Sequence, residues 1–167
     1  MIFVTAIVAL GGFMALSTQS NTMARSTTMT MVAAQQKMEQ LRGLTWGFDI
    51  LNLPVSDTTT DISVQPTTQT GSGLAPSPPN SLTQSFDGYV DYLDKYGNWI
   101  GTGVVPPRGM VYIRRWSIEP LPANPNNTLI LQVLVTKRAN RGAADAGAVG
   151  RLPEEARLVS VKTRKSL

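Results

Sequence analysis

The chain lacks two residue types that carry much of protein chemistry, because its 167 residues include no cysteine and no histidine. Without cysteine there is no disulfide framework, thiolate nucleophile or cysteine metal site. Without histidine the chain lacks the commonest general base, the usual zinc ligand and the middle member of a Ser-His-Asp relay. We therefore expect a protein that is not an enzyme, with no catalytic residue; no residue supports a small hydrolase.

Charge is sparse and only mildly basic. The chain has 15 Lys and Arg against 11 Asp and Glu, a formal net charge of +4, which is too scattered to form a basic face. The one local cluster, Lys162, Arg164 and Lys165, lies near the carboxyl end without aromatic residues that could stack on bases. Nucleic-acid binding needs a basic stripe or face, so we expect no nucleic-acid partner. The length suits one domain with one core.

The chain opens on an uncharged apolar run over residues 1–16. As a helix it would span about 24 Å, which is short of the roughly 30 Å hydrocarbon core of a bilayer. Three interpretations compete: a secretory signal peptide at residues 1–17, a buried core helix, and the distal part of a membrane helix. A signal peptide wants a positively charged start, which is absent here, although Ala15-Leu16-Ser17 passes as a cleavage site. A core helix should show a polar face, and this run has none.

The apolar run continues into an amphipathic segment. No proline or glycine falls between Phe13 and Arg42, and Met31, Ala34, Met38 and Leu41 recur at the spacing of one helix face. We therefore predict one helix over residues 1–46, with a membrane or filament-core part at 1–22 and an amphipathic part at 23–46. Met31, Ala34, Met38 and Leu41 would pack on a sheet. In the membrane or filament-core part, the side chains expected to contact lipid or other helices are Ile2, Phe3, Val4, Ile7, Val8, Leu10, Phe13 and Leu16.

Residues 47–167 read as a β-rich domain with long loops at 52–88 and 138–156. Alternating apolar residues and turn signals predict a short strand at 61–65, a hairpin of 89–93 with 99–104, and strands at 111–119, 128–137 and 157–163. A long helix followed by these strands predicts an α+β fold, with the helix packed on one face of an antiparallel sheet.

Few residues are candidates for chemistry. Asp91, Asp94 and Asn98 supply the oxygen ligands that calcium takes, but their spacing is not that of an EF-hand, and aspartate is common at β-turns. We therefore favour a turn and expect no cofactor. The Arg114-Arg115 pair beside Trp116 predicts a cation–π or ion-pair contact on the sheet surface.

The amino-terminal third resembles a known family. The run "MIFVTAIVAL", followed by Ser, Thr, Asn and Gln and then by "AAQQKMEQLR", is similar to the first helix of type IV pilin-like proteins, namely minor pilins of the pilus-modification class and minor pseudopilins of type II secretion. The stretch "RRWSIEPLPANPNNTLILQVLVT", residues 114–136, resembles their sheet region less specifically. The resemblance implies a helix whose first half lies in the bacterial inner membrane before assembly and in the filament core afterwards. It implies a periplasmic sheet on the second half.

One departure bears on the start of the helix. Family members begin with a short basic leader and a helix start that carries a glutamate, whereas the first acidic residue here is Glu39. We therefore expect that the sequence is shortened at its amino end and assign no leader or registration residue. The expected function is that of a structural filament subunit, single-pass in the inner membrane, whose partners are other pilin or pseudopilin subunits. The alternative is a secreted periplasmic binding domain with its signal peptide at residues 1–17.

Overall fold

A computed structural model describes residues 2–138 and 154–165, with side chains from Gly12 onward. The chain begins with helix α1 (Ile2–Gly43) and continues as strands. The strands described are β1 (Trp46–Phe48), β2 (Pro54–Ser56), β3 (Thr60–Asp61), β4 (Thr68–Gln69), β5 (Val90–Leu93), β6 (Trp99–Thr102), β7 (Tyr112–Pro120), β8 (Thr128–Lys137) and β9 (Ala156–Thr163). The long helix and the antiparallel sheet confirm the predicted α+β fold.

The main sheet has five strands in the order β6-β5-β7-β8-β9, and every neighbouring pair is antiparallel. Strands β7 and β8 are the longest pair and align Tyr112 with Lys137 at one end and Pro120 with Leu129 at the other. Side chains alternate between the two faces of each strand. One face of the sheet therefore carries Trp116 and Ile118, which belong to the main core, and the other carries Arg115 and Ser117.

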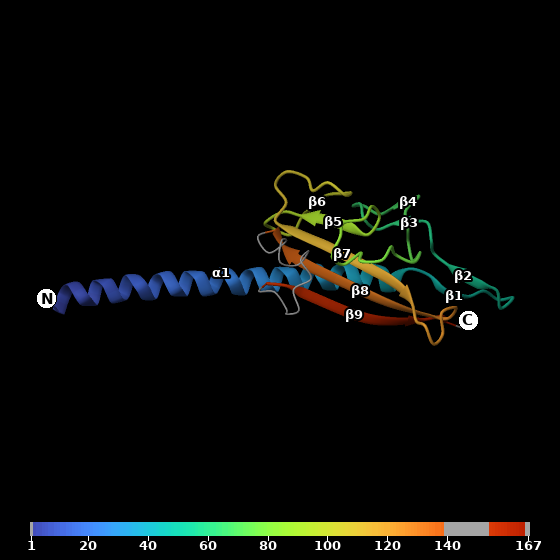
Figure 1. Cartoon of the computed structure of the whole chain (residues 1–167), viewed down its shortest axis with the longest axis horizontal. Coiled ribbons are helices and arrows are strands. Elements are labelled where there is room, and N and C mark those ends of the chain that lie inside the picture. The colour runs from blue at the N-terminus through green and yellow to red at the C-terminus, as the bar shows by residue number, and fades with distance from the viewer. Residues whose placement is uncertain (1, 139–153, 166–167) are drawn as a thin grey trace.

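Helix α1 lies along the first of these faces and continues well beyond the sheet at its amino end (Figure 1). It contacts β7, β8 and β9. Its 42 residues correspond to a rod of about 63 Å, which is far longer than the domain needs for coverage. The main core lies between the second half of the helix and the sheet, where Leu41, Trp116 and Leu131 are fully buried. A smaller cluster of Val90, Tyr92, Met110 and Ile113 covers the opposite face.

Several predicted boundaries differ from the structure. The helix ends at Gly43 rather than near Trp46, because Trp46 begins β1, a strand that the sequence interpretation missed. The segment predicted as a loop at 52–88 contains β2, β3 and β4, and β3 is shorter than the strand expected at 61–65. These strands form two small antiparallel pairs, β1-β2 and β3-β4, outside the main sheet. Most of the loop predicted at 138–156 lies outside the described residues.

Candidate assembly surface

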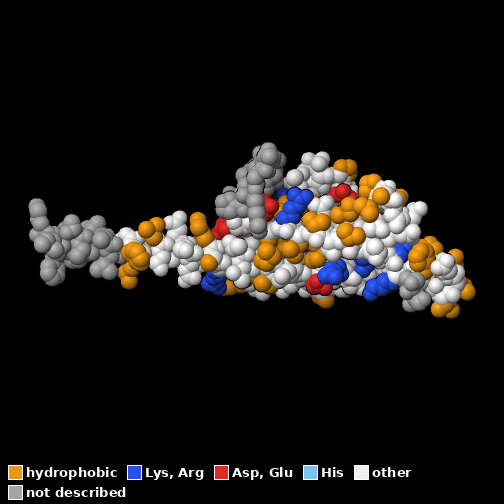
Figure 2. Space-filling view, turned by 90° about the horizontal axis from the view of Figure 1, so that it is seen from below, with side chains coloured by type: hydrophobic (Ala, Val, Ile, Leu, Met, Phe, Trp, Pro, Cys, Tyr) orange, Lys and Arg blue, Asp and Glu red, His pale blue; other side chains and the backbone are white. Residues whose placement is uncertain are grey.

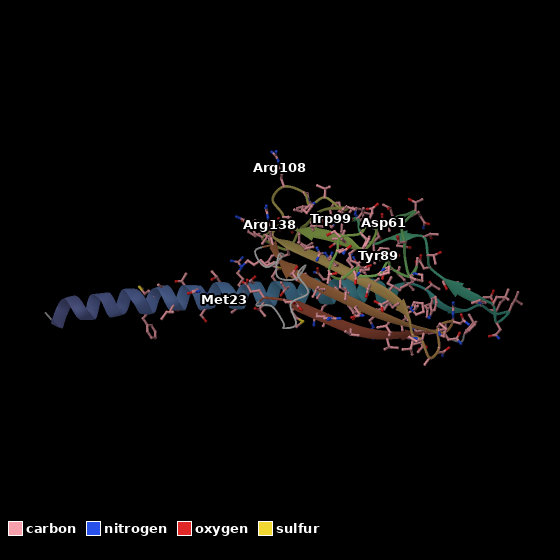
Figure 3. The ribbon with its side chains drawn as sticks, viewed as in Figure 1. Met23, Asp61, Tyr89, Trp99, Arg108 and Arg138 are labelled. Carbon is pink, nitrogen blue, oxygen red and sulfur yellow. The ribbon has the colours of Figure 1, made fainter. Side chains whose placement is uncertain are left out.

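Among the described side chains, the first part of α1 lies in the open instead of packing on its own domain. We call residues 12–25 the stalk; every side chain in it is exposed, and Phe13, Met14 and Leu16 are 77%, 72% and 68% exposed. Met23, a residue of the stalk, is labelled in Figure 3 on the part of α1 that extends beyond the sheet. Of the residues predicted for a membrane or filament core, Phe13 and Leu16 thus lie in the open. The side chains of Ile2, Phe3, Val4, Ile7, Val8 and Leu10 lie outside the described part of the structure.

Two polar residues of the stalk use their side-chain donors within the helix. The hydroxyl of Thr18 donates to the Met14 carbonyl at 2.9 Å, and that of Thr22 donates to the Thr18 carbonyl at 3.1 Å. A helix can therefore carry these groups into apolar surroundings with their donors already used. The stalk also has no charged residue before Arg25. Its surface is consequently suited to packing against other helices.

Among the described side chains of α1, burial begins at Ser26, which is 4% exposed and whose hydroxyl lies 3.4 Å from the Tyr112 hydroxyl. From there a single face turns toward the sheet. Ala34, Met38 and Leu41 are 0%, 5% and 0% exposed, and Met31 packs at the edge of the same core. This is the face that the apolar spacing predicted. The helix therefore changes from a free rod to a core element within one turn, at Ser26.

The same face carries a buried charge cluster, which we call the clamp: Lys37, Asp91 and Arg114. Lys37 Nζ lies 2.8 Å from Asp91 Oδ2, and Arg114 binds Asp91 with two bonds, from Nε to Oδ1 and from Nη2 to Oδ2, each 2.8 Å long. Arg114 also donates to the Ala33 carbonyl at 3.0 Å, and Lys37 donates to the Ile62 carbonyl at 2.5 Å. The clamp thereby joins α1 to β5, to β7 and to the segment after β3.

The clamp has two cations, Lys37 and Arg114, but only one anion, Asp91. Lys37 and Asp91 are fully buried, and Arg114 is 3% exposed. Burial lowers the pKa of Lys37 from 10.5 to about 8, although the Asp91 carboxylate opposes that change. The ammonium also lies 4.3 Å from the centre of the Trp116 ring, whose π face attracts a cation. The carboxylate and the ring together hold two buried cations in place.

The sequence interpretation did not find the clamp. It placed Arg114 in an ion pair or cation–π contact on the sheet surface, and that position is wrong, because Arg114 lies in the helix–sheet interface. The signal was present: Arg114 shares strand parity with Trp116 and Ile118, which are core residues. Arg115 points to the opposite face, where it bonds the Ser85 hydroxyl at 3.3 Å. It is also buried, so neither arginine lies on an open surface.

The calcium candidates separate in the structure. Asp91 is held by Arg114 and Lys37 in the core, whereas Asp94 Oδ1 accepts the amides of Tyr96 and Asn98 in the β5-β6 turn. The Asn98 side chain donates to Asp94 Oδ2 at 3.1 Å, as expected of a turn. In the described residues no group of three acidic side chains converges as a metal site would require.

The stalk, the buried helix face and the sheet together form a pilin-like architecture, with a long amino-terminal helix packed on an antiparallel sheet by its second half. Within the described part of the chain, no helix offers an apolar stretch of the length that crosses a bilayer. Comparisons with protein-family models, with curated proteins and with solved structures find no match to this chain.

Proposed function

We propose that this protein is a structural subunit of a type IV pilin-like filament, either a minor pilin or a minor pseudopilin of type II secretion. The observation that carries the proposal is the stalk, a helical segment whose apolar side chains are exposed while the same helix continues into a fully packed domain. An isolated soluble domain gains nothing from such a segment, because exposed Phe13, Met14 and Leu16 leave apolar area in water. Packing against the stalks of other subunits removes that area.

The chemistry of the stalk supports helix-to-helix contact. Small residues such as Gly12 and Ala15 let backbones approach closely, and Gly12 has open space where a Cβ would lie. The hydroxyls of Thr18 and Thr22 are satisfied within the helix, so close packing does not strand these two donors. Before assembly, the apolar start of the helix holds the subunit in the bacterial inner membrane with its domain in the periplasm. Its partners are other pilin or pseudopilin subunits.

The test places one charge in the stalk and the same charge elsewhere. Phe13→Asp puts a carboxylate into the proposed helix contact, and Val105→Asp puts it on an exposed loop residue that is 80% exposed. We expect the wild type and Val105→Asp in the membrane and sheared-filament fractions of the source cells, and Phe13→Asp lost from the filaments. Thermal unfolding of the three proteins should agree within about 0.5 kcal/mol, because neither side chain is part of the core.

Two results would overturn the proposal. Normal incorporation of Phe13→Asp into filaments would show that the stalk is not the contact. Wild-type protein free in the periplasm and beginning near Thr18 would instead support the secreted binding domain, since that result requires cleavage of a signal peptide within α1.

A further inference from the structure

The end of the molecule opposite the start of α1 carries a second exposed apolar surface. We call residues 49–53, which join β1 to β2, the distal turn. Ile50, Leu51 and Leu53 in it are 91%, 73% and 57% exposed. The distal turn protrudes beyond the sheet (Figure 1), and Lys165 forms a β-bridge with Gly47 of the adjoining strand β1. Hydrophobic side chains gather at this end of the molecule (Figure 2). The surface is a convex protrusion rather than a groove.

The distal turn is closed by its own hydrogen bonds. Asp49 Oδ1 accepts the amides of Leu51 and Leu53 at 2.9 and 2.8 Å, and the Asp49 amide donates to the Leu53 carbonyl at 2.9 Å. The Asn52 amide donates to the Asp49 carbonyl at 3.0 Å. Amides that are already bonded need no water, so these four donors add little cost when the turn enters apolar surroundings.

Cations surround the base of the distal turn. A hollow of about 420 Å³ beside it is lined by Arg42, Lys162 and Lys165 together with apolar residues such as Leu44 and Phe48. Burial lowers the pKa of Lys162, and the neighbouring charges of Lys165 and Arg42 lower it further. Nearby, the Arg164 guanidinium stacks on the Trp46 ring at 3.6 Å.

Acidic groups only partly offset these cations. Glu39 pairs with Arg42 at 3.2 Å, and the carboxylate of Asp49 is directed to amides of the distal turn. Among the described residues, these two carboxylates offset only part of the charge of Arg42, Lys162, Arg164 and Lys165, so a net positive charge remains around the hollow. An anionic partner would lower the repulsion among the charges of Lys162, Lys165 and Arg42.

We propose that the distal turn and its cations form a docking site for an anionic phospholipid surface. A protruding apolar turn fits a deformable layer, where Ile50, Leu51 and Leu53 would lie at the boundary of head groups and acyl chains. The cations at its base would then face the lipid head groups, each strengthening attraction to an anionic leaflet. The site is independent of the filament proposal, because the stalk and the distal turn occupy opposite ends of the molecule.

The experiment uses the absence of cysteine in the chain. Full-length Ile50→Cys carrying an environment-sensitive nitrobenzoxadiazole label is reconstituted in neutral phosphatidylcholine vesicles. Vesicles with roughly one third phosphatidylglycerol and a nitroxide-labelled lipid are then added. We expect a blue shift and quenching of the label. Val105→Cys with the same label is the matched control, because Val105 is 80% exposed on another loop and should report no change.

Further variants separate the apolar and the electrostatic contributions. Leu51→Ser combined with Leu53→Ser should weaken the response by at least about tenfold through lost apolar burial. Arg42→Gln and Lys165→Gln should each weaken it by about fivefold on anionic vesicles, whereas Lys95→Gln, a lysine of the β5-β6 turn, should not. Circular dichroism of each variant checks that the fold is retained.

Three outcomes would overturn the inference. The first is an unchanged label at position 50 when anionic vesicles are added. The second is an equal change in the label when neutral vesicles are added, because the cations would then contribute nothing to binding. The third is a label shift that depends on protein concentration without added vesicles, which would identify a second copy of the chain as the partner. Flotation with the neutral phosphatidylcholine vesicles separately reports whether the start of α1 anchors the protein in a bilayer. The filament proposal and the lipid-docking proposal can therefore fail independently.

Discussion

Replacing either of two members of the clamp should change stability by very different amounts. Asp91→Asn removes the anion that both Lys37 and Arg114 contact, and leaves two buried cations facing one another. Removal of one partner from a buried ion pair typically lowers the free energy of unfolding by about 3–5 kcal/mol. We expect a loss of that size. The reason is desolvation: the remaining charges stay buried without compensation.

Lys37→Met should be nearly neutral in the same protein. The pKa of Lys37 falls from 10.5 to about 8 on burial, which at about 1.4 kcal/mol per unit means that its charge opposes folding by about 3 kcal/mol. Against this relief, the variant loses a desolvated cation–π contact with Trp116, about 2 kcal/mol, and a hydrogen bond to Ile62, about 1 kcal/mol. The bidentate pair of Arg114 and Asp91 remains. We therefore expect a net change within about 1 kcal/mol.

Urea unfolding of the full-length chain measures both variants, with tryptophan fluorescence as the signal, because Trp116 is fully buried at the clamp. The difference between the two free energies of unfolding is the quantity that decides. If Lys37→Met lowered stability as much as Asp91→Asn, the clamp would not be an anion shared by two cations, and the reasoning would be refuted.

Three further predictions concern the same helix. Leu41→Ala should lower the free energy of unfolding by about 2–5 kcal/mol through lost burial and a residual cavity, while Phe13→Ala should change it by less than about 0.5 kcal/mol; calorimetry of both variants checks this. Between pH 8 and 10.5 the folded protein has released the Lys37 proton, whereas the unfolded chain still binds it. The free energy of unfolding should therefore rise with pH, by at most about 1.4 kcal/mol per pH unit, relative to that of Lys37→Met. Urea unfolding across that pH range measures the difference. A chain starting at Ser26 should unfold cooperatively, since burial of α1 begins there, and a non-cooperative melt would show that the stalk is needed for folding.

Periodicity revealed those parts of the fold that depend on repeated apolar positions. The helix could be predicted because Met31, Ala34, Met38 and Leu41 recur on one face. Strand β8 could be predicted because β-branched and leucine residues occupy every second position from Leu129 to Val135. The change in composition after Leu16 also indicated that the helix has two environments. Burial begins only at Ser26, about three helical turns after Leu16, because serine and threonine are compatible with either environment.

The remaining features depend on contacts between residues that are distant in sequence. Lys37, Asp91 and Arg114 each look like surface residues when taken alone, and only the pairing of β5 with β7 brings Asp91 opposite Arg114. Strand β1 was missed because its three residues have no alternation to read, and it depends on pairing with β2. The distal turn escaped notice for a related reason: apolar residues in a loop reveal their exposure only after the surrounding strands are placed.

The clamp also fixes an angle. Because α1 is continuous from Ile2 to Gly43, anchoring Lys37 to the sheet sets the rotational phase of every residue toward the amino end, at about 100° per residue. The packing of the domain therefore determines which side of the helix faces outward at Phe13, about seven turns away. One residue inserted between Met14 and Arg25 would rotate the far end by about 100° and advance it by about 1.5 Å, leaving the domain itself untouched. Inserting seven residues, close to two full turns, would nearly restore the original azimuth at a longer reach.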